Sequence, residues 1–534
     1  WNTYSKYILD VSFSEGITRI GNYACSSLSK IKKVIVPSTV STIGSYAFAN
    51  GNLSEVSISE GLREIESYAF SGCNIKEISL PNTLESIGNS AFSSSNIQSV
   101  VIPEACTTLG ISAFSGCTQL TSVQLPKALI SISKDLFKQC SNLSTINLPE
   151  SLQTIGDASF SRSGLKEITI PNSLTSLGCE AFQFCASLKK VSIASEISAI
   201  ASQTFSGCSS LSEVLLPQSL REIGNSAFSD CRSLESITLP SSLESIYDEA
   251  FRNSGLKSIS VPDNVNFVGS NVFTNSKITE PVFNKTIFIY MPREGFEEYS
   301  IPDNISVVNA TSFEGCNTIK NVSMGKVNVI GERAFAGCTA MTSVDLSQLN
   351  QLSIGKSAYE NSGLISFKFP NDIISIEANA FKGCVNLNGK IDLRNLNLTE
   401  LPEGLFADCQ KIDEILLPTS IRSIGHNCFQ NCEELENMTL PDQLSIIGRH
   451  AFENCMKSVS ELYSEFVDKG IKKEDARAIL PNACASSIVC SLNLRELIHL
   501  ANLRLCTRAQ LEIRTTVKKM CSLIIEKEPW LKEH

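Results

Sequence analysis

Apolar and small polar residues alternate in a pattern that returns every 22 or 23 residues along most of the chain. In one repeat, Leu120, Val123 and Leu125 are separated by polar residues, which predicts a short strand with one buried face. The proline that follows has no N–H to donate and therefore ends the strand. A second apolar triplet, as in residues 152–156, predicts a return path along the far side of the repeat.

An aromatic residue marks each repeat and fixes its phase. Phenylalanine or tyrosine recurs at positions 48, 70, 92, 114, 137, 160, 182, 205, 228, 251 and 273, and then at 313, 335, 359, 381, 406, 429 and 452. Cys25 occupies the same slot one period earlier, which makes 19 units. A unit of this size cannot bury an apolar face alone, so we expect stacked coils that share one continuous core.

Two further columns keep the same phase. Thirteen of the 18 prolines lie eleven residues before the aromatic residue, and 12 of the 20 cysteines lie three residues after it. The resulting pattern, clear from Leu216 to Cys231 and from Leu239 to Phe251, resembles the BspA-like leucine-rich repeats over about residues 17–455. The irregular stretch 278–312 resembles a variant unit of that family rather than a domain boundary.

That resemblance implies the fold class and a general role. We expect an α/β repeat solenoid, a leucine-rich repeat of about 19 coils with a stacked parallel sheet, over residues 1–455. Members of the family are mostly cell-surface or secreted proteins, so the resemblance implies a protein or matrix ligand bound by the solenoid. It implies no enzymatic activity and no cofactor for the repeats.

The outward strand positions predict a polar surface. One column of these positions contains Ser57, Ser79, Gln124, Asn147, Thr169, Ser192, Thr238, Ser260 and Ser323, and a second contains Glu55, Glu77, Ser99, Ser122, Thr145 and Glu167. Trp, Tyr and Arg dominate binding hot spots, and none of them occurs at these positions. Two interpretations stay open: a broad, weakly polar adhesive surface, and an ordinary solvated face of the sheet.

The repeat cysteines also allow two interpretations. Successive members such as Cys185, Cys208 and Cys231 are expected at inter-strand distance, which disulfide geometry permits on distance alone. All of them point the same way into a packed core, however, where a free cysteine behaves as a small hydrophobic residue. We therefore expect free thiols. No CxxC pair and no histidine at zinc spacing is present, so no metal site is predicted.

Composition and charge divide the chain into two unlike parts. Residues 456–534 contain 13 Lys and Arg against 10 Asp and Glu, a net charge of +3, which leaves 32 against 45, or −13, for residues 1–455. The acidic repeats argue against nucleic-acid binding, which needs a basic face. No apolar run is long enough to span a membrane.

Residues 456–534 lack the repeat and predict a small, mainly helical segment. Apolar residues at helical spacing follow Asn493 and again follow Thr507, which suits an N-cap. Five of the 16 arginines of the chain fall in this segment. Arginines beside an apolar stripe suit the recognition of phosphate or carboxylate, which is one interpretation of this segment. The alternative interpretation is a helical cap that closes the end of the solenoid.

Three blocks of this segment resemble the C-terminal third of flavin-dependent thymidylate synthase, which methylates dUMP with methylenetetrahydrofolate and FAD. They are residues 475–481, 493–499 and 503–514, in the order and spacing of that family. The resemblance implies that Arg477 and Arg504 contact dUMP, with Arg504 also polarising the uracil ring as the catalytic residue. It implies that FAD is bound by Asn493, Arg495, His499, Leu503 and Arg508.

One sequence motif of the synthase family is absent from residues 1–455. The signature Arg-His-Arg-x-x-Ser-x-Asn-Glu-x-Ser-x-Arg, which binds flavin and nucleotide phosphate in the family, has no match in residues 1–455. A complete site therefore needs a partner subunit, and we expect no catalysis by this chain alone. Two hypotheses follow: an interaction solenoid with an incomplete synthase-like tail, and a synthase in fused or truncated form. The first implies a cell-surface or secreted protein, and the second a cytoplasmic one.

Overall fold

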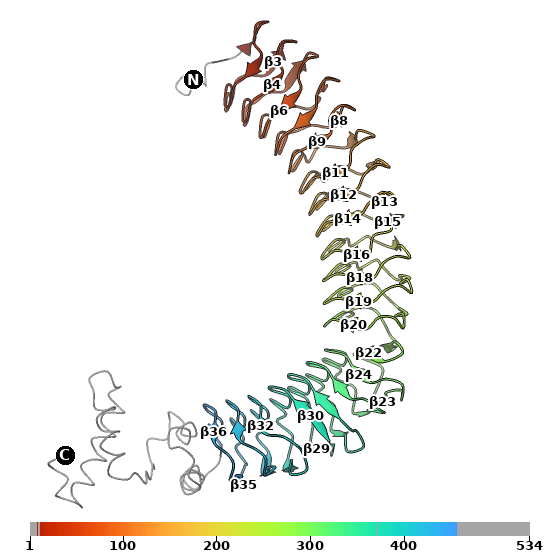
Figure 1. Cartoon of the computed structure of the whole chain (residues 1–534), viewed down its shortest axis with the longest axis vertical. Helices are drawn as coiled ribbons and strands as arrows, with labels where there is room; N and C mark the ends of the chain where they lie inside the picture. The colour runs from red at the N-terminus through yellow and green to blue at the C-terminus, as the bar shows by residue number, and fades with distance from the viewer. Residues whose placement is uncertain (1–7, 9–10, 371, 456–534) are drawn as a thin grey trace, which may run out of the picture. The chain divides into compact units, whose positions relative to one another are not determined.

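The computed structural model describes residue 8, residues 11–370 and residues 372–455. The chain divides into two compact units, Trp1–Leu387 and Asn388–His534, hereafter unit 1 and unit 2. The described part of each unit is a stack of coils, and the coils contribute strands to two series of short, mostly parallel sheets on opposite sides of the core (Figure 1). These two series are hereafter called the first sheet and the second sheet. The boundary placed at residue 455 from the sequence stays a prediction, because residues 456–534 lie outside the described part.

The first sheet contains the longer strands, which are the predicted LxxVxL segments. In unit 1 these strands are β1 (Val11–Ser12), β3 (Lys33–Val36), β5 (Glu55–Ile58), β8 (Ser99–Val101), β10 (Ser122–Gln124), β13 (Glu167–Ile170), β15 (Lys190–Ile193), β17 (Glu213–Leu215), β23 (Glu298–Ser300), β25 (Asn321–Ser323), β27 (Ser343–Asp345) and β29 (Ser366–Lys368). In unit 2 they are β31 (Gly389–Asp392), β33 (Ile412–Leu416) and β35 (Asn437–Thr439).

The second sheet is made mostly of two-residue strands from the second apolar triplet. In unit 1 they are β2 (Arg19–Ile20), β4 (Thr42–Ile43), β6 (Glu64–Ile65), β7 (Ser86–Ile87), β9 (Thr108–Leu109), β11 (Ser131–Ile132), β12 (Thr154–Ile155), β14 (Ser176–Leu177), β16 (Ala199–Ile200), β18 (Glu222–Ile223), β19 (Ser245–Ile246), β20 (Phe267–Val268), β21 (Val282–Phe283), β22 (Ile287–Tyr290), β24 (Val307–Val308), β26 (Val329–Ile330), β28 (Leu352–Ile354) and β30 (Ile373–Ile376). Unit 2 contributes β32 (Glu400–Leu401), β34 (Ser423–Ile424) and β36 (Ile446–Ile447).

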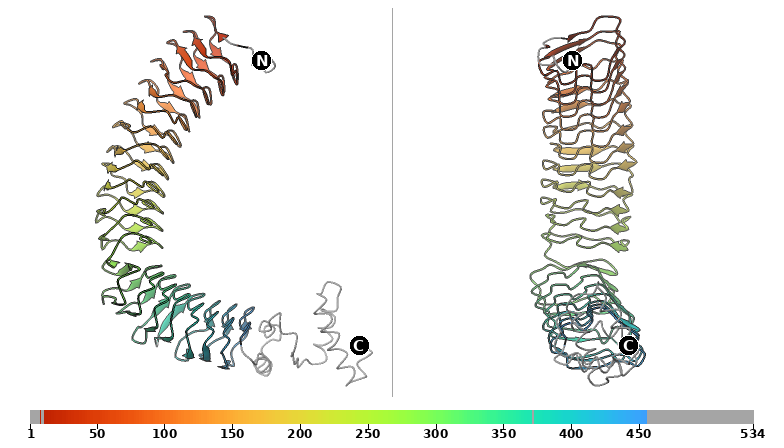
Figure 2. Two further views of the ribbon diagram at one scale, coloured as in Figure 1. Left: turned by 180° about the vertical axis from the view of Figure 1, so that it is seen from behind. Right: turned by 90° about the vertical axis from the view of Figure 1, so that its left-hand side faces the viewer.

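Equivalent residues of successive coils pair in parallel. Val34 lies opposite Val56 in the first sheet, and Ile43 lies opposite Ile65 in the second. Figure 2 shows the resulting rungs of unit 1 from two further sides. Among the described strands, only β21 and β22 pair antiparallel, inside the irregular stretch 278–312. This stretch lies within unit 1, as expected for a variant coil.

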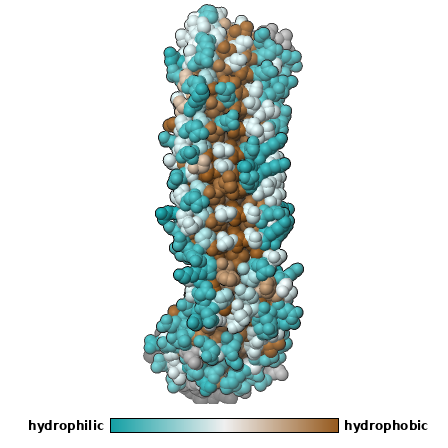
Figure 3. Space-filling model, turned by 90° about the vertical axis from the view of Figure 1, so that its right-hand side faces the viewer, coloured by the Kyte–Doolittle hydropathy of each residue, from teal (hydrophilic) through white to brown (hydrophobic). Residues whose placement is uncertain are grey.

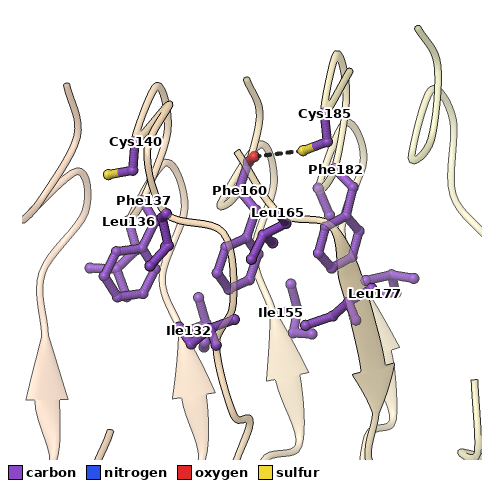
Figure 4. Packing of buried hydrophobic residues seen from close by; sticks show 14 of the residues in the cluster. Ile132, Leu136, Phe137, Cys140, Ile155, Phe160, Leu165, Leu177, Phe182 and Cys185 are labelled. Atoms are coloured by element: carbon purple, nitrogen blue, oxygen red, sulfur yellow. Dashed lines mark hydrogen bonds between the residues drawn. The ribbon is translucent and has the colours of Figure 1, made fainter. Parts of the chain in front are cut away.

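The aromatic residues form a continuous buried ladder, as the sequence predicts. From Phe48 to Phe273 in unit 1, successive rings stack with their centroids 5.2–5.8 Å apart. Figure 4 shows three of these rings above the isoleucine and leucine side chains of the core. Burial of each such side chain contributes roughly 1.5–3 kcal/mol, so the ladder is a main source of cohesion between coils.

The expected α/β class is wrong for the repeats, because no residue of the described part is helical and the coils form a β-solenoid. Each coil returns through a turn that contains non-glycine residues at positive φ, for example Tyr46 at 57° and Asn50 at 55°. Two such residues within five positions prevent a helical hydrogen-bond ladder. The predicted helical segment 456–534 lies outside the described residues. Within those residues, no helix is long and apolar enough to cross a membrane.

Candidate functional site

The exposed face of the first sheet is less polar than the sequence predicted. The column that contains Ser57 and Ser192 also contains Ile35, Val101 and Leu215, each more than half exposed. Figure 3, which views the side of unit 1 where β13 and β15 lie, shows a hydrophobic stripe flanked by hydrophilic side chains. Exposed apolar and polar side chains therefore occur together on this face, and both interpretations of it stay open.

A second exposed feature lies at the turns of three consecutive coils in unit 1. Tyr23, Tyr46 and Tyr68 stand two residues before the core position of their coils and stack on one another. Their ring centroids are 4.9 Å and 4.6 Å apart, and the interplanar angles are 5° and 6°. Tyr23 is 61 % exposed and Tyr68 37 % exposed. We call these three residues the tyrosine ladder.

The backbone at the tyrosine ladder is strained. The three tyrosines have φ values of 57–58°, a left-handed conformation that bulky residues rarely adopt. The turn itself does not require tyrosine, because Ser90 and Ser112 occupy the same position in the next two coils at similar φ. The left-handed conformation is a property of the repeat, since Ala158, Glu180 and Arg333 adopt it at the same position of later coils. The three tyrosine coils differ from these in the stacked rings that they present at this turn.

A charged network holds the backbone at the edge of the ladder. Glu66 accepts hydrogen bonds from the backbone N–H and the hydroxyl of Ser45, at 2.9 Å and 3.0 Å, and pairs with Arg19 at 2.5 Å. Partial burial opposes ionisation of Glu66, but the hydrogen bonds from Arg19 and Ser45 outweigh it and lower the pKa of this carboxyl. The network fixes the residue before Tyr46 and so positions the central ring of the ladder.

The tyrosine ladder was detectable in the sequence but was not predicted. Its three members lie 23 and 22 residues apart, in phase with the aromatic, proline and cysteine columns. Tyrosine is a hot-spot residue that is absent from the outward strand columns and occurs at the turns instead. The stacking of their rings, which only the structure shows, distinguishes the three tyrosines from the residues at this position in other coils.

The repeat cysteines have a structural role, as predicted. No disulfide bond joins the described cysteines, and Cys179 alone among them is exposed. Burial raises the pKa of Cys185 to about 11 and that of Cys73 to about 12, so these thiols stay protonated near neutral pH. Thiolate chemistry is therefore suppressed along this column.

The residues that the synthase resemblance implies all lie outside the described part of the chain. They are Arg477, Asn493, Arg495, His499, Leu503, Arg504 and Arg508. Their roles toward dUMP and FAD stay predictions. Within the described ranges, no group of three or more His, Cys, Asp or Glu side chains is arranged to hold a metal ion.

The fold and its exposed surfaces define a parallel β-solenoid of the leucine-rich repeat class. The family model described as "BspA type Leucine rich repeat region (6 copies)" matches residues 3–121, 41–166, 175–291, 289–353 and 352–468. The chain therefore belongs to the BspA-type leucine-rich repeat family, as its repeat pattern predicted.

Solved structures of leucine-rich repeat proteins are similar to this chain. A leucine-rich repeat protein from Eubacterium ventriosum is 27 % identical, with a TM-score of 0.41, and the match covers 52 % of this chain and 86 % of that one. A leucine-rich repeat protein from Bacteroides ovatus is also 27 % identical, with a TM-score of 0.38 and coverage of 74 % and 87 %.

The curated relatives belong to a different family and match a short stretch. The flavin-dependent thymidylate synthase of Pyrococcus abyssi is 51 % identical over 73 residues, which is 14 % of this chain and 30 % of that enzyme. The enzyme of Geobacter sulfurreducens is 45 % identical over 69 residues, 13 % of this chain and 30 % of the enzyme. The chain thus spans less than a third of the length of these relatives, and it is thymidylate synthase-like over that stretch.

Proposed function

We propose that the solenoid is a protein-binding scaffold and that the tyrosine ladder is a principal contact site for its protein or matrix ligand. The observation that carries this proposal is the stack of Tyr23, Tyr46 and Tyr68 at the turns of three consecutive coils, in which Tyr23 and Tyr68 are exposed and Tyr46 is half-buried. Stacking and the turn restrict the rings before binding, so less side-chain entropy is lost when a partner covers them.

The ladder combines an apolar ring surface with hydroxyl groups at the spacing of the coils. Tyrosine supplies a large contact area and a polar end, which is why it is frequent at interfaces. The Arg19–Glu66 pair adds charged groups at one edge, where they favour correctly charged partners over others. The hydrophobic stripe along the first sheet provides a second, broader surface for weak adhesion (Figure 3).

The experiment compares one triple variant and one single variant with the unchanged chain for binding to an immobilised panel of extracellular-matrix proteins. Tyr23→Ser, Tyr46→Ser and Tyr68→Ser are combined, because serine occupies this turn position in the next two coils. Phe184→Ser is the matched control, since Phe184 is another exposed aromatic residue at positive φ. We expect the triple variant to lose binding by about tenfold or more while the control binds normally. Equal binding by both variants and the unchanged chain would contradict the proposal.

A second candidate function rests on the match to thymidylate synthases. We infer that residues 456–534 supply part of a synthase site, in which Arg477 and Arg504 bind dUMP and Arg504 polarises its ring. Asn493, Arg495, His499, Leu503 and Arg508 would bind FAD. The 51 % identity to the Pyrococcus abyssi enzyme favours this hypothesis, and the match covers 30 % of that enzyme, so these residues account for part of a synthase site. The scaffold is the better supported function.

A further inference from the structure

One coil of unit 1 lacks the turn that carries the buried aromatic residue in the other coils. The backbone N–H groups of Glu249, Phe251 and Asn253 each donate to a carbonyl of the next turn. In the following coil this pattern changes, because the N–H of Asn271 donates instead to the hydroxyl of Thr311, 40 residues further on, at 2.7 Å. The irregular stretch between them contributes β21, β22, β23 and β24 but no complete turn of this kind.

The missing turn leaves a groove of about 520 Å³. Arg293, which follows β22, lies where the absent turn would have been. Its Nη1 donates to Oδ1 of Asn275 in the turn before the groove at 3.2 Å. On the other side, a Cβ built on Gly315 would lie 3.7 Å from Nε of Arg293, so the guanidinium packs over this glycine.

Arg293 differs from the other arginines that line the groove. Arg252 pairs with Glu249 at 2.8 Å, and Arg333 pairs with both Glu314 and Glu360 at 2.6 Å and 2.8 Å. For Arg293, the described residues provide one amide oxygen and no carboxylate within ion-pair distance. A guanidinium has five N–H donors in a planar fork, and that of Arg293 keeps most of them available.

We propose that this groove binds an acidic peptide segment, with an Asp or Glu carboxylate of the peptide on Arg293. A carboxylate can accept two parallel hydrogen bonds from one guanidinium, which makes arginine the suitable residue. The side-chain amides of Asn275, Asn317 and Asn361 also line the groove and offer both donors and acceptors to a peptide main chain.

The lining favours a peptide over an acidic sugar. The groove is lined by Arg, Glu, Asn, Thr, Gly and Ala side chains, and no aromatic residue on its walls offers a sugar ring a stacking surface. The glutamates are already paired, so they select against ligands with several adjacent charges and favour a single well-placed carboxylate. The inference rests on the proposed scaffold function but not on the tyrosine ladder, which lies in other coils.

The test measures fluorescence anisotropy with labelled octapeptides of Gly, Ser and Ala that carry one or two Glu, each with a Gln twin. We expect the full chain to bind at least one Glu peptide about tenfold more tightly than its twin, and Arg293→Gln to abolish that difference. Arg293→Lys should restore part of the affinity because it keeps the charge but loses the fork. Arg162→Gln is the matched control, since Arg162 is also an exposed turn arginine and lies outside the groove.

Three other outcomes of the peptide-binding test would contradict the proposal. Failure of every Glu peptide to bind better than its twin excludes an acidic peptide, and equal losses in Arg293→Gln and Arg162→Gln exclude the groove. Tighter binding of an oligogalacturonate than of any peptide would assign the groove to acidic sugars. Circular dichroism and the melting temperature confirm that each variant is folded. The tyrosine ladder is intact in these variants. The outcome of the matrix-binding assay for the ladder is therefore independent of the outcome of the peptide-binding assay for the groove.

Discussion

The thiol of Cys185 donates a hydrogen bond to the carbonyl oxygen of Phe160 in the preceding coil, with Sγ and O 3.1 Å apart (Figure 4). The same bond joins Cys73 to Phe48 and Cys208 to Phe182 at 3.1 Å. Ser163 also lies 3.2 Å from the sulfur of Cys185, so serine continues this column where cysteine is absent. The cysteine column therefore adds a side-chain hydrogen bond from each of these coils to the one before it.

Removal of one such thiol should weaken the solenoid. Cys185→Ala loses the bond to Phe160 and leaves a small gap, so we expect a loss of about 1–3 kcal/mol in the free energy of unfolding. Cys179→Ala is the control, because Cys179 is exposed and should tolerate the change. Urea denaturation measures both variants, and an unchanged midpoint for Cys185→Ala would show that the bond and its packing contribute nothing.

The buried thiols should also make stability fall at alkaline pH. The pKa of Cys185 is raised from 9.0 to about 11 in the folded protein. Its contribution to stability is therefore complete below about pH 9 and is lost as the pH rises towards 11, by up to about 1.4 kcal/mol per pH unit. Urea midpoints from pH 7.5 to 10.5 test this, with Cys185→Ser as the comparison. Serine does not ionise in this range, so a slope equal to that of the unchanged chain would refute the assignment.

The aromatic ladder predicts a large effect at its centre. The ring of Phe228 stacks between Phe205 and Phe251 at centroid distances of 5.4 Å and 5.3 Å and is fully buried. Phe228→Ala should destabilise unit 1 by about 3–5 kcal/mol, because the neighbouring rings cannot collapse into the gap. Phe184→Ala, at a 43 % exposed position, should have a much smaller effect on the urea midpoint. Similar small shifts for both would mean that Phe228 is not a core residue.

The sequence predicted the core more completely than the candidate sites. Residues that repeat at a fixed period must be equivalent in a stack, so the buried phenylalanines and thiols followed from spacing alone. The return path was misassigned to an α/β class because the sequence pattern does not show the positive φ values of Tyr46 and Asn50. The Arg293 groove lies where one turn is absent. The aromatic, proline and cysteine positions that reveal the other coils are missing there, so their spacing could not predict the groove.

Tyr359 is a tyrosine within the buried aromatic ladder, which otherwise consists of phenylalanines in its neighbouring coils, and its replacement by phenylalanine should stabilise the protein. Its ring stacks between Phe335 and Phe381 at 5.2 Å and 5.3 Å, but its buried hydroxyl has no hydrogen-bond partner among the described residues. An unsatisfied buried hydroxyl costs about 1–3 kcal/mol, so Tyr359→Phe should raise the free energy of unfolding by a similar amount. Tyr46→Phe, which removes the hydroxyl of a partly exposed tyrosine, is the control. A loss of stability in Tyr359→Phe would reveal a bond to this hydroxyl.

The last prediction concerns residues 456–534 and separates the two functional hypotheses. The match to curated synthases covers 30 % of their length, so the implied contacts from Arg477, Arg504 and Arg508 form only part of a site. Electrostatic catalysis needs donors preorganised around the reacting base, and each missing charged hydrogen bond costs about 1.5–3 kcal/mol. We therefore expect the purified chain to be colourless and to form no dTMP from dUMP and methylenetetrahydrofolate. Absorbance near the flavin bands and product analysis check both points, with a complete synthase as the positive control. A yellow preparation whose turnover is abolished by Arg504→Ala would instead establish the chain as an enzyme.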